Sequence, residues 1–394
     1  MRRVYLLAVT LLALLLAACD VVPPAGGTPE PDAPAPAPSE EPGGGEAASE
    51  APPEDPGGSE APAPSDAPEP DDEAPADEGT LRGAAAAAGI EFGTAVAAAP
   101  LQDEQDYREV LAREFDSVTA ENVMKPDAVQ PTRGQFDFSQ GDALVEFAEA
   151  NGQVVRGHTL LWHSQNPAWL TSGSFSDEEL LEILRDHVTE VVRHYRGRVK
   201  YWDVANEVID DSANLRDSVW SQLGERYIAE AFRAARAADP DAGLYLNDYG
   251  IDGINAKSDA YYELVQRLLA DGVPIDGIGF QTHLISGQLP GDMQQNLQRF
   301  ADLGLEVAIT EADVRIALPV DDADLATQAE TFRGSLEACL AVPECVSYTV
   351  WGFTDRHSWV PGVFDGQGAA TPMTEDLAPK PAYDALLEAL QAAG

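Results

Sequence analysis

Basic residues are scarce in this chain of 394 residues. It has 24 Lys and Arg against 68 Asp and Glu, which gives a formal net charge of −44 at pH 7. A surface this acidic argues against nucleic acid as a partner, and also against attraction to anionic lipid through charge. The acidity is typical of a protein that stays soluble or works in salty surroundings, and it names no substrate.

Long apolar runs are also lacking, except at the amino terminus. Two arginines there precede an apolar run, Val4–Ala18, which is short for a membrane span and ends in small residues. This pattern predicts a signal peptide over residues 1–18. Leu16-Ala17-Ala18-Cys19 is similar to a bacterial lipobox, so we expect lipidation at Cys19 and a cell-surface or envelope lipoprotein anchored to a bacterial membrane. The alternative is an ordinary cleavage site beside a chance cysteine.

Cysteine is rare, with three in the whole chain. Apart from Cys19, the two cysteines are Cys339 and Cys345, which lie six positions apart. In an exported protein a single remaining pair favours a disulfide. A metal site is the alternative, although His357 is the only histidine close to them in the sequence.

Aromatic and basic residues are missing from residues 20–80, which consist almost wholly of Ala, Pro, Gly, Ser, Asp and Glu. This stretch holds 17 carboxylates and no Lys or Arg. It has too little apolar surface to offset the entropy of ordering, so residues 19–80 are predicted to be a lipidated Cys19 followed by a disordered acidic linker. Residues 81–394 remain to fold, and one αβ barrel of ordinary size fits that length.

The folding part alternates between two kinds of segment. Short apolar segments predict strands at Phe92–Val96, Ser117–Met124, Val154–Leu161, Tyr201–Val208, Leu244–Asp248, Gly277–His283, Val307–Val314 and Ser347–Phe353. Longer segments with helical apolar spacing predict helices at Tyr107–Phe115, Gly141–Ala150, Asp177–Tyr195, Arg226–Ala238, Lys257–Ala270, Asp292–Leu303, Asp324–Leu340 and Pro381–Ala392. Eight such units predict a single (β/α)8 TIM barrel. A doubly wound sheet is the alternative.

Polar residues gather at the ends of seven predicted strands, where the active sites of such barrels lie. Two of them, Glu207 and Glu311, fall on opposite walls of the barrel mouth and can face each other across a bound chain. Cleaving a glycosidic bond needs an acid for the leaving oxygen and a carboxylate for the oxocarbenium-like carbon. Two close carboxylates do not both ionise cheaply, so we expect one to have a raised pKa and to act as the acid.

Other chemistries have less support in the sequence. No Gly-rich phosphate loop and no nucleophile elbow occurs, which leaves nucleotide chemistry and serine-type acyl transfer without a motif. The spacing of His158, His163 and His283 in the sequence does not exclude a zinc site. The favoured interpretation is that each imidazole hydrogen-bonds and orients a carboxylate. We therefore expect no metal and no cofactor.

Six motifs give a specific resemblance. They are Glu-Asn-Val-Met-Lys (121–125), Arg-Gly-His-Thr-Leu-Leu-Trp-His-Ser-Gln (156–165), Trp-Asp-Val-Ala-Asn-Glu (202–207), Gly-Phe-Gln-Thr-His (279–283), Ile-Thr-Glu-Ala-Asp (309–313) and Trp-Gly-Phe-Thr-Asp-Arg-His-Ser-Trp (351–359). In this order they resemble glycoside hydrolase family 10, the (β/α)8 family of endo-β-1,4-xylanases. The resemblance covers essentially all of residues 82–394. It implies a retaining enzyme that hydrolyses internal bonds of xylan.

The resemblance also implies roles for matching residues. Glu207 is expected to be the acid/base and Glu311 the nucleophile, with carboxyl groups about 5–5.5 Å apart. Asn206 is expected to bond the 2-hydroxyl of the reacting sugar, and His283 to bond Glu311 while leaning on Asp313.

The expected substrate-binding residues fall into groups by subsite. His158, Trp162 and Lys125 would hold the sugar at the cleavage point, and Gln281 would also bind substrate. The glycone side would be shaped by Glu121, Asn122, Gln165, Trp351 and Trp359, and the aglycone side by Tyr249. The two tryptophans are expected to leave no room for a hydroxymethyl group, which favours xylose over glucose.

Two rival functions remain at this point. A cellulase or mannanase on the same kind of barrel would keep both glutamates. A non-catalytic sugar-binding lipoprotein would keep the aromatic residues but lose one glutamate, and both are present here. The expected partners are xylan and xylo-oligosaccharides, with a membrane through Cys19, and the protein is expected to be a monomer.

Overall fold

The computed structural model describes residues 79–394 and contains a closed barrel of parallel strands. The barrel strands are β1 (Glu91–Val96), β2 (Ser117–Ala120), β3 (Val154–Leu161), β4 (Tyr201–Asn206), β5 (Gly243–Asp248), β6 (Gly277–Phe280), β8 (Glu306–Ala317) and β9 (Cys345–Val350). Each pairs with its neighbour in this order, and β9 pairs with both β8 and β1, which closes the ring. The (β/α)8 prediction is therefore confirmed, and an open doubly wound sheet is excluded.

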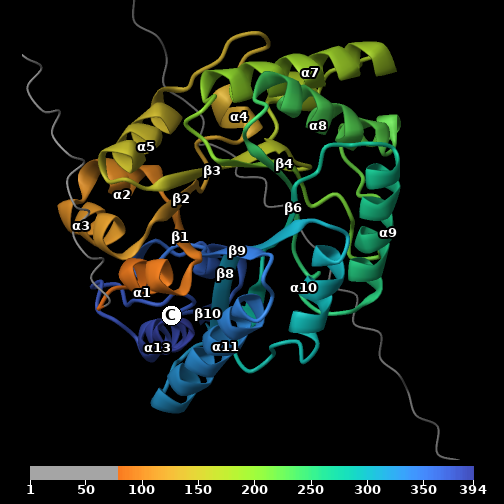
Figure 1. The fold of residues 1–394 in the computed structure, drawn as a ribbon. Coiled ribbons are helices and arrows are strands. Elements are labelled where there is room, and N and C mark those ends of the chain that lie inside the picture. The colour runs from red at the N-terminus through yellow and green to blue at the C-terminus, as the bar shows by residue number, and fades with distance from the viewer. Residues whose placement is uncertain (1–78) are drawn as a thin grey trace, which may run out of the picture. The chain divides into compact units, whose positions relative to one another are not determined.

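Helices surround the strands. They are α1 (Leu81–Ala88), α2 (Ala98–Asp103), α3 (Gln105–Glu114), α4 (Pro126–Val129), α5 (Ser139–Ala150), α6 (Ala168–Thr171), α7 (Asp177–His194), α8 (Arg226–Ala238), α9 (Ala256–Ala270), α10 (Met293–Ala301), α11 (Asp322–Leu340), α12 (Val360–Val363) and α13 (Pro381–Ala393). Figure 1 shows the longer ones as an outer ring around the barrel. All eight predicted helices are present, with ends shifted by a few residues.

Helix α7 shows how the sequence specifies this outer layer. Ser176 caps it by accepting from the N–H of Glu179, whose carboxylate accepts from the N–H of Ser176 in return. Leu184, Val188 and Val191 recur at helical spacing and are fully buried. The helix therefore begins at a strong cap and packs one apolar face inward.

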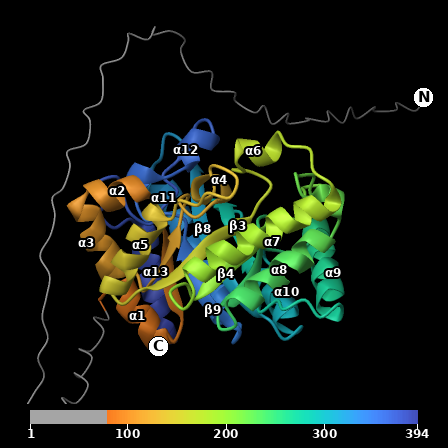
Figure 2. The same cartoon turned by 90° about the horizontal axis from the view of Figure 1, so that it is seen from above.

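The two ends of the barrel differ. In Figure 2 the short helices α4, α6 and α12 lie at one end, where loops leave the carboxyl ends of the strands. The opposite end carries α1 and the carboxyl-terminal helix α13, which pack against each other. Glu114, the last residue of α3, links these two helices. It accepts from the N–H of Leu81 in α1 at 3.2 Å and from the hydroxyl of Tyr383 in α13 at 2.8 Å.

Several strands end earlier than the sequence predicts. The predicted strands 117–124, 201–208 and 277–283 stop at Ala120, Asn206 and Phe280. Glu207 and Thr282 have φ of 56° and 62°, which is incompatible with continuing a strand. These early ends turn polar side chains into the barrel mouth.

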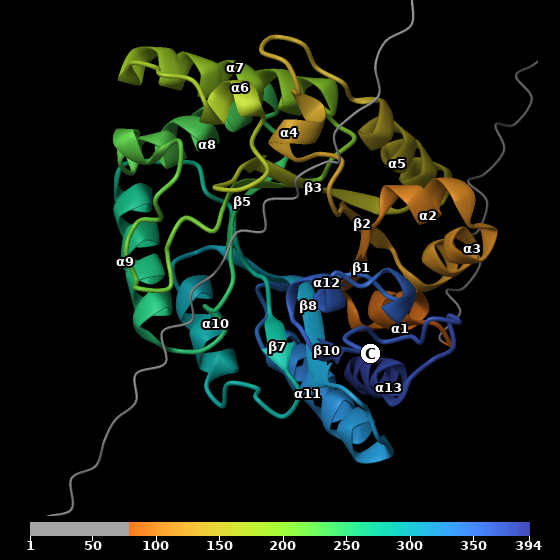
Figure 3. The ribbon, with the colours of Figure 1, turned by 180° about the vertical axis from the view of Figure 1, so that it is seen from behind.

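Strand β8 is longer than predicted and runs past the barrel rim. Beyond the barrel it pairs with β7 (His283–Ile285) on one side and with the antiparallel β10 (Gln367–Gly368) on the other. Figure 3 shows both short strands beside β8. This small extra sheet fixes the registers of His283 and Asp313, which are paired across β7 and β8.

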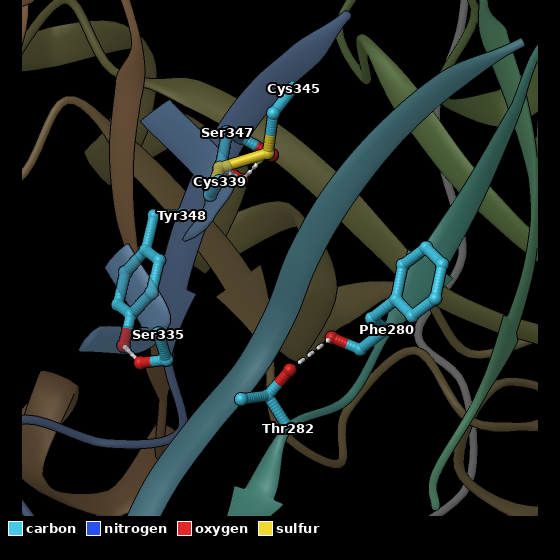
Figure 4. Close-up of a disulfide and its surroundings, with 7 residues drawn as sticks. All are labelled: Phe280, Thr282, Ser335, Cys339, Cys345, Ser347 and Tyr348. Atoms are coloured by element: carbon cyan, nitrogen blue, oxygen red, sulfur yellow. Dashed lines mark hydrogen bonds between the residues drawn. A yellow bond between two sulfur atoms is a disulfide. The ribbon is translucent and has the colours of Figure 1, made fainter. Parts of the chain in front are cut away.

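The predicted disulfide between Cys339 and Cys345 is confirmed, and its alternative, a metal site at these cysteines, is wrong. It joins the end of α11 to the first residue of β9 (Figure 4). Because β9 begins at Cys345, the disulfide lies at the amino-terminal end of the barrel strands. It is therefore placed at the end opposite the predicted active site.

The predictions for the amino terminus stay predictions. The signal peptide over residues 1–18, the lipidation site Cys19 and nearly all of the acidic linker lie outside the described residues. Among the described residues, Thr80 accepts from the N–H of Gly83 and caps α1. Within residues 79–394, no helix is long and apolar enough to cross a membrane.

Candidate active site

The carboxyl ends of the strands bring the predicted site residues to one end of the barrel. Most stand at or just beyond a strand: Glu121, Asn122 and Lys125 after β2, His158 within β3, Trp162 and Gln165 after it, Asn206 and Glu207 at β4, Tyr249 after β5, Gln281 after β6, His283 in β7, Glu311 and Asp313 in β8, and Trp351 and Trp359 after β9. Hydrogen bonds and ring contacts link most of them, and they are described below in three groups.

Glu311 is buried and tightly hydrogen-bonded. Its Oε2 lies 3.2 Å from Nε2 of His283, and its Oε1 accepts from Nδ2 of Asn247 at 2.8 Å. Nδ1 of His158 lies 3.9 Å from the same Oε1. Burial works to raise the pKa of Glu311, but the bonds from His283 and Asn247 and the nearby His158 together hold this pKa below its usual value. Glu311 is therefore kept ionised and fixed in place.

His283 connects Glu311 to a second carboxylate. Its Nδ1 lies 2.9 Å from Oδ2 of Asp313, which also accepts from Nε1 of Trp359 at 2.7 Å. Burial works to lower the pKa of His283, but Asp313 and then Glu311 raise it to about 10. At neutral pH the imidazole thus carries both protons and donates to both carboxylates. The predicted contacts of His283 with Glu311 and Asp313 are confirmed.

Glu207 is held differently. Its Oε1 accepts from Nε2 of Gln281 at 3.2 Å, and Asn206 offers only a long contact of 3.4 Å. Its other oxygen, Oε2, lies 3.4 Å from Nδ1 of His163. The backbone at Glu207 is left-handed, a conformation that costs a non-glycine residue about 1–3 kcal/mol. Strain of this kind persists where surrounding contacts hold a functional side chain in place.

Three side-chain amides connect the two glutamates. Asn247 donates from the same Nδ2 to Glu311 and, at 2.9 Å, to Oδ1 of Asn206. Gln281 donates to that same oxygen of Asn206 at 3.1 Å as well as to Glu207. All three amides are buried. Glu207 and Glu311 therefore belong to one continuous hydrogen-bonded network across the barrel mouth.

His158 has a carboxylate partner beneath it. Its Nδ1 lies 3.0 Å from Oδ2 of Asp203, whose other oxygen lies 3.5 Å from the buried guanidinium of Arg156. The three histidines considered as zinc ligands each face a carboxylate: His158 faces Asp203, His163 faces Glu207, and His283 faces Asp313. In residues 79–394 no group of three or more His, Cys, Asp and Glu is arranged to hold a metal ion. The imidazoles orient and polarise the carboxylates.

A second group of polar residues surrounds Lys125. Its Nζ donates to Oδ1 of Asn122 at 3.0 Å and to Oε1 of Gln165 at 2.9 Å, and it lies 4.7 Å from the ring centroid of Trp162. Burial lowers the pKa of Lys125, opposed by the nearby glutamates, while burial raises that of Glu121. An ammonium, two amides and an indole are therefore gathered close to the glutamates.

The third group is formed by aromatic residues along the mouth. Trp351 is buried, and its ring lies edge-on to His158 and His283 with centroids 5.2 Å and 6.4 Å apart. The ring of Trp359 lies 5.0 Å from that of His283. Tyr249 directly follows β5, and its hydroxyl accepts from Arg216 at 2.8 Å.

A cavity of about 870 Å³ occurs elsewhere and contains none of these residues. It is lined by residues at the amino-terminal ends of the strands, including Glu91, Tyr201, Glu306 and Cys345. Four of its charged groups form two ion pairs, Lys200 with Glu91 and Arg236 with Asp276. None of the residues predicted to be catalytic or substrate-binding lines this cavity.

The family model of glycosyl hydrolase family 10 matches residues 80–389. This chain belongs to that family. The six motifs of the sequence thus identified the family correctly, and the two glutamates, the amides and the histidines described above lie together at one end of its barrel.

Curated relatives and solved structures agree with this assignment. An endo-1,4-beta-xylanase of Agaricus bisporus is 52% identical over 276 residues, covering 70% of this chain and 83% of that protein. Endo-1,4-beta-xylanase B of Thermotoga neapolitana is 47% identical, covering 74% and 85%. The crystal structure of xylanase 10B from Thermotoga maritima has a TM-score of 0.78 at 46% identity, covering 79% of this chain and 98% of that one. A Thermotoga petrophila xylanase 10B with the same TM-score and identity was solved with xylobiose.

The sequence alone assigned no role to three residues of this network. Asn247 bridges Asn206 and Glu311, Asp203 supports His158, and Arg216 bonds the backbone of Glu207. Asn247 and Asp203 each lie on a barrel strand beside a predicted residue, so their place at a strand end or in a matched motif was an available signal. Arg216 lies in the loop after β4, where no periodicity marks it.

Proposed function

We propose that this chain is a retaining endo-1,4-beta-xylanase in which Glu311 is the nucleophile and Glu207 the acid/base. Membership of family 10 and the xylanase relatives support the reaction and the substrate. The assignment of the two glutamates rests on one observation: Glu311 is buried, has a lowered pKa and accepts a 2.8 Å bond from Asn247 beside the 3.2 Å contact with His283, whereas Glu207 is partly buried and its two hydrogen bonds are 3.2 Å and 3.4 Å long. A nucleophile must stay ionised, and an acid/base must gain and lose a proton.

In the first step a carboxylate oxygen of Glu311 attacks the anomeric carbon of a xylose unit. The carboxyl group of Glu207 gives its proton to the glycosidic oxygen, the carbon–oxygen bond breaks, and the shortened chain leaves with a new hydroxyl. The glycosyl-enzyme ester remains on Glu311. His283 then keeps its hydrogen bond to the carboxyl oxygen, which orients the ester.

In the second step Glu207, now a carboxylate, removes a proton from water. The water oxygen attacks the anomeric carbon from the side that the first chain left, and the bond to Glu311 breaks. Glu207 is again protonated and Glu311 again ionised. Two inversions give a product with the β configuration of the substrate.

The amide network supports both steps. Oδ1 of Asn206 accepts from both Asn247 and Gln281, so its amide nitrogen is turned away from them. That nitrogen makes one long bond of 3.4 Å to Glu207, and its second hydrogen can be donated to the 2-hydroxyl of the reacting sugar. That contact strengthens as positive charge develops at the neighbouring carbon. Asn247 and Gln281 thus fix the orientation of Asn206 relative to the two glutamates.

The remaining polar and aromatic groups line a path for a xylan chain. The Lys125 group, with Asn122, Gln165 and Trp162, supplies donors and a ring on the glycone side. Trp351 and Trp359 crowd the same side near the reacting sugar, which suits xylose because it has no hydroxymethyl group. Tyr249 receives the leaving chain. Xylan and xylo-oligosaccharides are the substrates that this lining fits.

The stereochemical course tests the proposal. Proton NMR of xylohexaose during the first minutes of hydrolysis should show the β-anomer of the new reducing end before mutarotation mixes the anomers. The viscosity of a xylan solution should fall well before reducing sugar accumulates, because internal bonds are cut. Appearance of the α-anomer first would contradict a covalent intermediate on Glu311.

We further propose that Cys19 carries a lipid that anchors the enzyme to a bacterial membrane. The support is the lipobox of residues 16–19 and the short apolar run before it. Cells given a fatty-acid probe should label the wild-type protein and not the variant Cys19→Ala. Equal labelling of both proteins would contradict the anchor.

A further inference from the structure

Arg216 makes an unusual set of contacts for a loop residue. Its Nε donates to the main-chain oxygen of Glu207 at 2.7 Å. Its Nη2 donates to the main-chain oxygen of Ile209 at 3.0 Å and to the hydroxyl of Tyr249 at 2.8 Å. The residue lies in the segment between β4 and α8, nine positions after Glu207. One guanidinium therefore joins this loop to the acid/base and to the residue after β5.

The backbone of Glu207 depends on contacts of this kind. Its φ of 56° is left-handed, and a side chain at such a position crowds its own carbonyl. The N–H of Glu207 donates to the main-chain oxygen of Asn247 at 2.8 Å, and its carbonyl accepts from Arg216. These two bonds lie on either side of the Cα atom. Together they set the direction in which the carboxyl side chain leaves the backbone.

The same guanidinium fixes Tyr249 on the leaving-group side. The hydroxyl of Tyr249 accepts from Arg216 and donates to Oδ1 of Asp211 at 2.6 Å. The ring is held from its face by Lys257, whose Nζ lies 3.4 Å from the centroid. Arg216 therefore holds both Tyr249, on the leaving-group side, and the backbone of Glu207.

We propose that Arg216 is a positioning residue that aims Glu207 at the glycosidic oxygen of the leaving chain. This inference rests on the proposed acid/base role of Glu207. Arg216 acts through the backbone of Glu207, so its loss should impair proton transfer more than nucleophilic attack. Its three acceptors bond to two different nitrogens of the planar guanidinium, Nε and Nη2, an arrangement that the single ammonium of a lysine can reproduce only in part.

The test compares two substrates that differ in their need for a proton. Xylohexaose needs acid catalysis of its leaving group, whereas dinitrophenyl β-xylobioside does not. In Arg216→Met we expect kcat for xylohexaose to fall about 100-fold, because small misplacements of a catalytic group cost that much. The burst rate of dinitrophenol release should fall less than about fivefold. Arg216→Lys should recover part of the loss. Equal losses on the two substrates, or no loss on either, would overturn the proposal.

Two further variants separate this role from a structural one. Arg226→Met removes an exposed arginine at the start of α8 and should leave both rates within about twofold of the wild type. Tyr249→Phe removes the hydroxyl but keeps the bond to Glu207, so it should raise KM for xylohexaose and leave kcat nearly unchanged. If Tyr249→Phe reproduces the difference between the substrates, the anchor works through Tyr249 and the proposal is wrong. Arg216→Lys carries the same comparison should Arg216→Met fail to fold.

The outcome for Glu207→Ala distinguishes failure of this inference from failure of the proposed function. That variant should show the same difference between substrates, and a larger one. If Glu207→Ala loses both activities equally, its acid/base role is wrong. If Glu207→Ala shows the difference and both Arg216 variants do not, only the role of Arg216 is wrong.

Discussion

Glu311 lies in the middle of a long strand, whereas Glu207 is the first residue beyond the end of a short one. Around Glu311 the extra pairing of β7 with β8 places His283 and Asp313 side by side, so the carboxylate meets an imidazolium from a rigid sheet. Around Glu207 the strand breaks into a left-handed residue, and a loop arginine holds the carbonyl. The proposed nucleophile is thus fixed by a sheet and the proposed acid/base by a loop.

This difference matches the demands on each group. A nucleophile is used in one protonation state and gains from donors that keep it ionised. An acid/base changes protonation state in every turnover, so strong donors would trap it as the carboxylate. Because both residues are glutamates, their different surroundings are what separate them into two proposed roles.

The largest loss of activity is expected when Glu311 is replaced. Glu311→Ala should lose activity by about 10⁴-fold or more on xylohexaose and on dinitrophenyl β-xylobioside alike, because no other group is placed to form the glycosyl-enzyme. Glu207→Ala should lose xylohexaose cleavage but keep a burst of dinitrophenol. Steady-state rates and stopped-flow bursts with both substrates check this. A burst from Glu311→Ala would contradict its role.

The next effect concerns the charge beside Glu311. His283→Gln removes the imidazolium that holds the pKa of Glu311 down, so the acid limb of the kcat/KM profile should move to higher pH. Loss of one preorganised donor should also cost about 100-fold in kcat. His194→Gln, an imidazole on α7 bonded to Asp142, is the matched control and should leave the acid limb in place. An unmoved limb in His283→Gln would contradict the electrostatic role.

The same histidine gives a signed prediction for stability. Its pKa is raised to about 10 in the folded protein, above the unfolded value of about 6.5. The stabilisation that it contributes is therefore fully present below pH 6.5 and is lost as pH rises through 10. The wild type should lose more free energy of unfolding between these pH values than His283→Gln does, as measured by denaturant unfolding across that range.

A smaller loss of activity is expected at Trp359. Its indole donates to Asp313, which is linked to Glu311 through His283. Trp359→Ala should lower activity on xylan by about tenfold and narrow the gap to glucose-based substrates, because it removes both the ring and the bond to Asp313. Trp359→Phe keeps a ring and loses only the bond, so it should keep most of the preference for xylan. An unchanged ratio of xylan to cellulosic rates in Trp359→Ala would contradict the steric role.

The smallest effect on activity lies at the other end of the barrel. Replacing Cys339 and Cys345 by serine should lower stability by about 2 kcal/mol, as the chain-entropy account gives for so short a loop. Activity should stay near that of the wild type, because the disulfide lies where β9 begins and the chemistry lies where it ends. A large loss of kcat in a protein that remains folded would show that the two ends are coupled.

Much of this molecule could be predicted from its sequence. The eight strands and the helices between them follow from local apolar spacing, and the strand ends carry polar residues that a barrel must gather. The extension of β8, with β7 and β10 beside it, was missed because its pairing partners are far apart in the sequence and very short. Arg216 was missed for a similar reason, since its partners are two main-chain oxygens and a tyrosine just beyond the next strand.

Rescue with azide tests the different roles of the two glutamates most directly. Azide should enter the space left in Glu311→Ala and attack the sugar once, which gives an α-glycosyl azide with inverted configuration. In Glu207→Ala it should attack the glycosyl-enzyme formed on Glu311, which gives a β-glycosyl azide with retained configuration. Proton NMR of the two products reads the configuration. Opposite anomers in this order are the predicted result, and the reverse order, or the same anomer from both variants, would contradict the account.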